Sequence, residues 1–146
     1  LYGAYFMVPD GVLRNIVYHH AICSVGADTI NLVAADEQAQ ADGNMIRSRN
    51  AALEIVRGCD GAGAMFLLLA AVFAFPSSWK HKLIGLLGAL LLAYTVNQLR
   101  IVLLYFVAAY QPTWFAPLHS FFLPTLVVLV YCVLFGFWVL AVEARR

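Results

Sequence analysis

The sequence predicts an all-α fold, which is a polytopic bundle of transmembrane helices with an interfacial helix. A short segment on its outer face can also form a small hairpin. Hydrophobic residues make up 63% of the 146-residue chain and charged residues only 12%, whereas a soluble domain is about half apolar and about a quarter charged. The mean hydropathy is +0.82, and three long apolar runs lie within residues 60–76, 83–109 and 118–142. These runs predict an integral membrane protein whose immediate surroundings are lipid.

The composition also excludes two classes of protein. The formal net charge is +1, with no basic run and no nucleic-acid signature, so we expect no nucleic-acid partner. The three cysteines, Cys23, Cys59 and Cys132, are odd in number and irregularly spaced. One pair can form, but such a set is not a disulfide framework, and at least one thiol is expected to be free.

The chain begins at Leu1, and residues 1–8 resemble the end of a membrane helix whose start is missing. We therefore expect one membrane domain over residues 1–146 with an incomplete N-terminus. Residues 10–58 are expected to form a segment on the outer face, because they are too polar to span a bilayer.

Within that segment, residues 10–35 are amphipathic. Five residues fall on one face at helical spacing, namely Val12, Leu13, Ile16, Val17 and His20, and they predict a helix at the membrane interface. Residues 35–50 are hydrophilic and contain the turn signal Gly43-Asn44. Beyond it, Met45-Ile46 and residues 53–56 can pair as a hairpin across Arg49-Asn50.

The three apolar runs predict three transmembrane helices with short connections. The first run, 60–76, opens at Asp60, a plausible N-cap, and ends at Pro76. Its helix of about 24 Å is short for a hydrocarbon core of about 30 Å. Residues 77–82 and 110–114 are expected to be turns, the second with interfacial aromatic residues.

Basic residues indicate the orientation of these helices. Lys80 and Lys82 lie two crossings away from Arg145 and Arg146, so both basic groups share one side, whereas the loop 110–117 has no Lys or Arg. The positive-inside rule places the basic side in the cytoplasm. We therefore expect a multi-pass protein of the cell inner (cytoplasmic) membrane, with residues 9–59 outside.

Three reactive side chains then share the outer leaflet. Cys59 lies at the outer end of its helix, and His119 at the outer end of the last helix. Arg100 lies 17 residues after Leu83, which is about 25 Å of helical rise from the cytoplasmic end. An arginine at a helix centre in a membrane costs about 2.5–3.5 kcal/mol, and the position near the outer face lowers that cost.

Cysteine, arginine and histidine together suit acyl transfer through a thioester. The Cys59 thiolate is a nucleophile, and a helix N-terminus or a nearby cation favours its ionisation. His119 can take and return a proton near neutral pH. Arg100 can stabilise an oxyanion or hold the substrate carbonyl. Asn97, three residues earlier on the same face, can orient the guanidinium or bond the substrate backbone.

These motifs resemble the exosortase/archaeosortase family. The resemblance rests on Gly58-Cys59-Asp60-Gly61 before an apolar helix, Asn97-x-x-Arg100-Ile101 in the next helix and His119 opening the last. It covers roughly residues 10–142, and the three motifs are specific only as a set. The stretch Tyr18-His19-His20 and the short length suggest the exosortase H-like branch.

The resemblance implies a membrane-embedded cysteine protease or transpeptidase, with no cofactor and no metal. Members cleave proteins that carry a C-terminal sorting tail, which consists of a short motif, a transmembrane helix and a basic cluster, and are thought to pass the product to a surface acceptor.

The resemblance also implies roles for individual residues: Cys59 as nucleophile, His119 as acid and base, and Arg100 as oxyanion or substrate stabiliser. Gly58, Asp60 and Asn97 would support them, with the active site facing the extracytoplasmic side. Asp60 departs from the pattern, since the family often has a small hydroxylated residue there and a carboxylate beside a thiol opposes its ionisation.

Two other readings remain open. The chain can be a non-catalytic transport or assembly subunit in which Arg100 is a structural counter-ion of Asp60 or Glu54. Alternatively, Cys59 and His119 can join His19, His20 and Cys23 in a metal or redox site. Solvated or hydrogen-bonded histidines explain the His19-His20 pair more simply.

Overall fold

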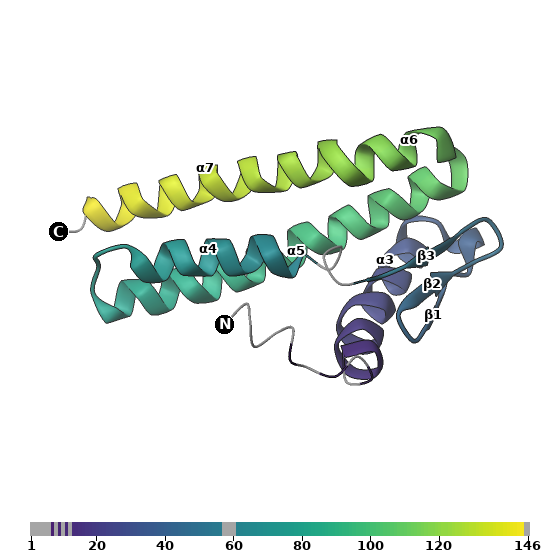
Figure 1. Cartoon of the computed structure of the whole chain (residues 1–146), viewed down its shortest axis with the longest axis horizontal. Helices are drawn as coiled ribbons and strands as arrows, with labels where there is room; N and C mark the ends of the chain where they lie inside the picture. Colours follow the sequence, from purple (N-terminus) through teal and green to yellow (C-terminus); the bar gives the residue numbers. More distant parts are fainter. Residues whose placement is uncertain (1–6, 8, 10, 12, 57–60, 145–146) are drawn as a thin grey trace.

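A computed structural model describes residues 7, 9, 11, 13–56 and 61–144 of the chain. Most of these residues are helical (Figure 1), and the prediction of a mostly α-helical membrane protein is confirmed. The expected membrane helix at residues 1–8 lies outside the described residues except for Met7. The helices are η1 (Leu13–Ser24), α3 (Val25–Val33), η2 (Ala35–Glu37), α4 (Ala62–Ala74), α5 (Trp79–Tyr110), α6 (Pro112–Pro117), η3 (Leu118–Phe122) and α7 (Leu123–Glu143).

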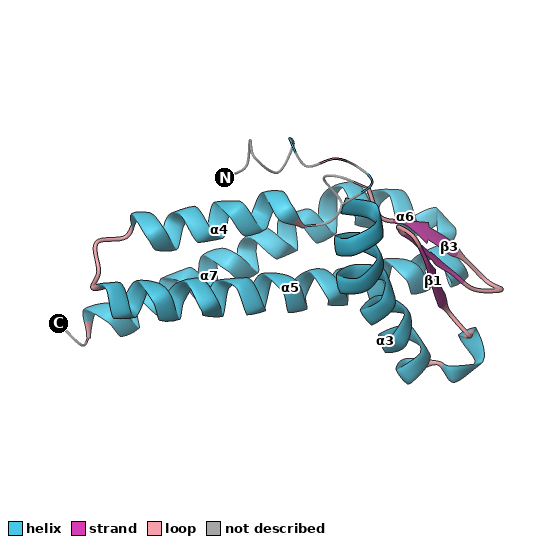
Figure 2. Ribbon diagram, turned by 90° about the horizontal axis from the view of Figure 1, so that it is seen from below, coloured by secondary structure: helices cyan, strands magenta, loops and turns pink. Residues whose placement is uncertain are grey.

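Three apolar helices, α4, α5 and α7, lie side by side along the length of the molecule (Figures 1 and 2). The helix α5 and the continuous helical stretch Pro112–Glu143 have 32 residues each and are long and apolar enough to cross a membrane. The helix α4 has 13 residues, or about 20 Å of rise, and is shorter than a full span. Its Leu68 and Val72 pack into an apolar core with Ala89 and Ala93 of α5.

The structure corrects both expected turns between the apolar runs. The helix α5 begins at Trp79, so Lys80 and Lys82 lie in its first turn and only residues 75–78 connect it to α4. The first backbone bond of α5 runs from the Lys82 amide to the Ser78 carbonyl at 3.0 Å. The Lys82 ammonium also donates to the backbone carbonyl of Phe73 at 2.7 Å, which caps the end of α4. Residues 112–117 form the helix α6, because Pro112 occupies a first helical position, where its missing N–H costs nothing.

A small antiparallel sheet precedes α4, with strands β1 (Gln40–Asp42), β2 (Met45–Arg47) and β3 (Ala52–Glu54) in the order β1-β2-β3. The predicted hairpin across Arg49-Asn50 is confirmed, since Ile46 pairs with Leu53. The turn Gly43-Asn44 is also present, and it joins β2 to β1, a strand that the sequence analysis did not predict.

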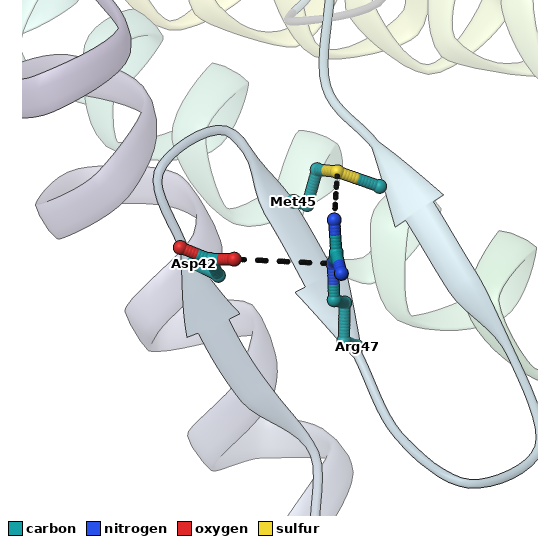
Figure 3. A network of polar contacts seen from close by, with 3 residues as sticks. All are labelled: Asp42, Met45 and Arg47. Carbon is teal, nitrogen blue, oxygen red and sulfur yellow. Dashed lines mark hydrogen bonds and ion pairs between the residues drawn. The ribbon is translucent and has the colours of Figure 1, made fainter.

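The two faces of the sheet differ. Ile46 and Leu53 are buried on the inner face. On the outer face, the Arg47 side chain lies between Asp42 and Met45 (Figure 3). Its Nε is 3.9 Å from the Asp42 carboxylate, and one terminal nitrogen donates to the Met45 sulfur at 3.2 Å. Because both charged side chains are more than half exposed, this ion pair adds little stability.

The expected amphipathic helix forms as η1 followed by α3, and both pack beside α5 (Figure 2). The backbone carbonyl of Ala21 accepts hydrogen bonds from the Tyr94 hydroxyl at 2.6 Å and from the Gln98 amide at 3.0 Å. Gly26 lets α3 lie close to β2, because a Cβ at that position would lie 2.9 Å from the Ile46 side chain. The helices and the sheet therefore form one unit against the C-terminal half of α5.

A buried carboxylate, that of Glu37, ties this unit to the end of α5. Glu37 is 2% exposed and accepts hydrogen bonds from Tyr105 at 2.5 Å and from Tyr110. Ser48 and Asn50 donate to it from the β2–β3 turn, at 3.2 and 3.1 Å. These hydrogen bonds lower the pKa of the Glu37 carboxyl to about 2, and those from the Tyr105 and Tyr110 hydroxyls contribute most.

We expect Glu37→Gln to lower the thermal unfolding temperature of the detergent-solubilised protein by several degrees at pH 7. The folded-state pKa is depressed, so the carboxylate stabilises the fold above its ordinary pKa of 4.5, and this contribution is lost as the pH falls from about 4.5 towards 2. The measurement is the difference in unfolding temperature between the two proteins from pH 7 to pH 3. Asp36→Asn, at the exposed neighbouring carboxylate, is the control. A difference that stays constant over this range would contradict the assignment.

Candidate functional site

The candidate site begins where α4 starts. Gly61, the residue before α4, has φ +77°, a backbone conformation that glycine adopts at little cost. A Cβ at Gly61 would lie only 2.6 Å from the Asn97 side-chain oxygen. Gly61 follows Cys59 by two residues in the sequence. The described end of the segment that carries Cys59 therefore lies directly against Asn97 on α5.

Gly61→Ala is expected to abolish most of the activity of the protein, because the added Cβ meets Asn97 and must displace either α5 or the start of α4. Gly43→Ala is the matched control, since Gly43 also has a positive φ, +59°, but nothing lies within 4 Å of its Cβ position. In both variants the alanine must adopt a positive φ, which destabilises the fold by roughly 1–2 kcal/mol. We expect only Gly61→Ala to impair substrate processing at equal membrane abundance; equal impairment of the two would contradict the close contact.

Arg100 and His119 lie within electrostatic range of each other. Arg100 comes one helical turn after Asn97 on α5, and His119 lies in η3, on the chain that returns from α6. The His119 ring stacks on Phe115, with ring centres 5.4 Å apart and planes 12° apart. The element η3 is a π-helical turn, and such wide turns are frequent at functional sites. Two of the three predicted catalytic side chains thus lie within electrostatic range of each other.

The third predicted side chain, Cys59, lies outside the described residues, as do Gly58 and Asp60. The other two cysteines have surroundings that do not suit a nucleophile. Cys23 is fully buried, and burial raises its thiol pKa to about 11, so this thiol stays neutral near pH 7. Cys132 lies in the middle of α7 and lines an apolar groove between α4 and α7.

The described residues bear on the two alternative readings of the sequence. Among residues 13–56 and 61–144, no three His, Cys, Asp or Glu side chains lie together as metal ligands. The His19 and His20 rings contact edge to face at 4.7 Å. Glu54, one suggested counter-ion of Arg100, is exposed and accepts a hydrogen bond from Asn44 at 3.1 Å. Asp60, the other suggested counter-ion, lies outside the described residues.

The sequence analysis missed Tyr131 on α7. It is 5% exposed and lies within electrostatic range of Arg100, and its hydroxyl points at the backbone carbonyl of Ala93 at 3.5 Å. A contact of that length is at most a weak hydrogen bond. The sequence feature that indicates such a residue is a tyrosine in the middle of an apolar run, because its hydroxyl needs a hydrogen-bond partner there.

Comparison with known proteins identifies the family. The family model described as transmembrane exosortase matches residues 1–138, which is nearly the whole chain. No curated protein and no solved structure matches it. The assignment to the H-like branch stays a prediction. On the strength of the match across its length, the chain belongs to the transmembrane exosortase family.

Proposed function

We propose that the chain is a cysteine transpeptidase that cleaves the C-terminal sorting tail of surface-destined proteins through a thioester on Cys59. One observation carries the proposal: His119 lies within electrostatic range of Arg100, which comes one helical turn after Asn97, the residue against which Gly61 packs. Family membership supports membrane location and the exosortase assignment. The roles of the individual residues are our inference.

The proposed reaction has two acyl-transfer steps. The Cys59 thiolate attacks the carbonyl carbon of the scissile peptide bond, and Arg100 stabilises the oxyanion of the tetrahedral intermediate. His119 donates a proton to the leaving amine as the C–N bond breaks, so the tail departs and a thioester remains. A nucleophile of the acceptor then gives its proton to His119 and attacks the thioester, which breaks the C–S bond and restores the Cys59 thiolate beside a protonated His119.

We further propose that this site faces the extracytoplasmic side of the cytoplasmic membrane. Lys80 and Lys82 lie in the first turn of α5, and Arg100 lies some twenty residues further on, about 30 Å along the helix axis. If the basic end is cytoplasmic, Arg100 and His119 lie near the opposite surface. A substrate whose own helix spans the membrane would present its cleavage motif at that depth, with its basic cluster on the cytoplasmic side.

The test is the fate of a candidate tail-bearing protein in cells that carry Cys59→Ala. Full-length substrate should accumulate in these cells, whereas Cys132→Ala, the control, should process the tail at the wild-type rate. The readout is the mass of the C-terminal peptide of an N-terminally tagged substrate. Continued tail removal by Cys59→Ala would reject the peptidase reading and favour the non-catalytic transport or assembly subunit.

A further inference from the structure

The two edges of the sheet differ in their surroundings. In antiparallel pairs, successive residues point their backbone N–H and C=O groups alternately towards and away from the partner strand. At the β1 edge, Ala39 points its groups outwards, and the Asn31 side chain on α3 satisfies both of them, at 2.7 and 2.9 Å. This contact occupies the start of the β1 edge, and η1 and α3 both contact β1.

The edge of β3 is different. The amide of Ile55 donates to the carbonyl of Asn44 at 2.8 Å, and the amide of Ser48 donates to the carbonyl of Ala51 at 2.9 Å. These bonds, with the Ile46–Leu53 pair between them, direct the backbone of residues 51, 53 and 55 towards β2. The alternation then directs the backbone groups of Ala52 and Glu54 away from the sheet.

Those outward groups have no protein partner. Both Ala52 and Glu54 are exposed, and throughout the part of the chain that the structure describes, no group bonds their outward N–H or C=O. An unpaired strand edge is a template on which an extended peptide can add as a further strand. The two residues offer two donors and two acceptors in the alternation that such a peptide requires.

The position of β3 relates this open edge to the candidate site. The inner face of β3 packs through Leu53 into the same apolar cluster as Ile101, the residue after Arg100, and β3 lies beside the C-terminal half of α5 (Figure 1). Cys59 comes five positions after Glu54, which is at most about 18 Å of extended chain. A peptide on β3 is therefore within a few residues of the thiol.

We propose that β3 binds the substrate polypeptide in extended form, as a fourth strand of the sheet, and so delivers its scissile bond to Cys59. The occupant is a stretch of substrate main chain next to the cleavage motif, held by its backbone groups. Its side chains would alternate between the exposed face that carries Arg47 and the face towards α5. This inference rests on the proposed function, because it assigns the binding mode of the same substrate.

Ala52→Pro tests the proposal. Proline at this position removes the outward N–H and leaves every hydrogen bond to β2 in place, whereas the control Ala52→Val keeps the N–H. The probe is the candidate tail-bearing protein, reconstituted with each purified variant in vesicles. We expect Ala52→Pro to lower kcat/KM about tenfold or more through a raised KM, with an unchanged unfolding temperature, because the substrate carbonyl loses its donor. Wild-type kinetics for Ala52→Pro would overturn the proposal.

A second measurement covers the case in which Ala52→Pro does not fold. A photo-crosslinking amino acid at position 54 should capture the substrate segment next to the cleavage motif, whereas the same group at position 42, on the covered strand β1, should not. Crosslinks that map elsewhere on the substrate, or equal capture from both positions, would overturn the proposal. Failure of the proposed function itself is distinguishable, since it shows as continued processing by Cys59→Ala.

Discussion

Substitution of Arg100 by lysine is expected to reduce substrate processing about a hundredfold at unchanged protein abundance. Lysine keeps the positive charge, so a residue that serves only as a counter-ion would tolerate the change. The proposed role needs the planar guanidinium, which can present two N–H donors at once to an oxyanion or a carbonyl, and a lysine ammonium cannot reproduce that fork. Loss of one oxyanion donor typically costs about a hundredfold or more in kcat.

The measurement for Arg100→Lys is the initial rate of tail release, together with the unfolding temperature. Arg47→Lys is the matched control, since Arg47 is an exposed arginine on the outer face of the sheet, outside the candidate site. A normal rate for Arg100→Lys would show that the guanidinium has no role beyond its charge. A lowered rate accompanied by a lowered unfolding temperature would show instead that Arg100 stabilises the fold.

The second large effect is expected for His119→Gln, which should lower kcat by about a hundredfold to ten-thousandfold. Glutamine can still donate and accept hydrogen bonds, but it cannot carry a proton from one group to another. The loss should appear in kcat and leave KM nearly unchanged. The dependence of the rate on the protonation state of His119 should also disappear from the pH profile.

His81→Gln is the control for this substitution. His81 lies in the first turn of α5, at the other end of the bundle, and its ring nitrogen Nδ1 pairs with the Ser78 hydroxyl at 2.9 Å. Its replacement should leave rate and pH profile unchanged. If His119→Gln raises KM and keeps kcat and the pH profile, His119 binds substrate and transfers no proton.

Much of this architecture was predictable from the sequence because it depends on local pattern. Apolar runs identify α5 and the stretch that ends in α7, and the Arg49-Asn50 turn identifies the hairpin of β2 and β3. The bounds of the helices were less predictable. The helix α5 starts earlier than expected, where Lys82 contacts the end of α4, and the short helix α6 starts at Pro112. An apolar run encodes neither of these bounds.

The candidate site was only partly predictable. Counting helical rise placed Arg100 and His119 at one depth, and the structure brings them into electrostatic range. The Glu37 cluster was not predictable, because its tyrosine donors lie about seventy residues away in the sequence and no local pattern connects them. The contact of Gly61 with Asn97 and the open edge of β3 likewise depend on tertiary packing and strand register.

The most direct test of the central claim is mass spectrometry of the peptide that contains Cys59, after the protein is incubated with a candidate tail-bearing substrate and quenched in acid. We predict an adduct on Cys59 equal in mass to the substrate without its tail, which hydroxylamine releases as a thioester. The adduct should form far more slowly in His119→Gln, which cannot protonate the leaving amine. Released tail with no adduct on Cys59, or an adduct on Cys23 or Cys132 instead, would contradict the account.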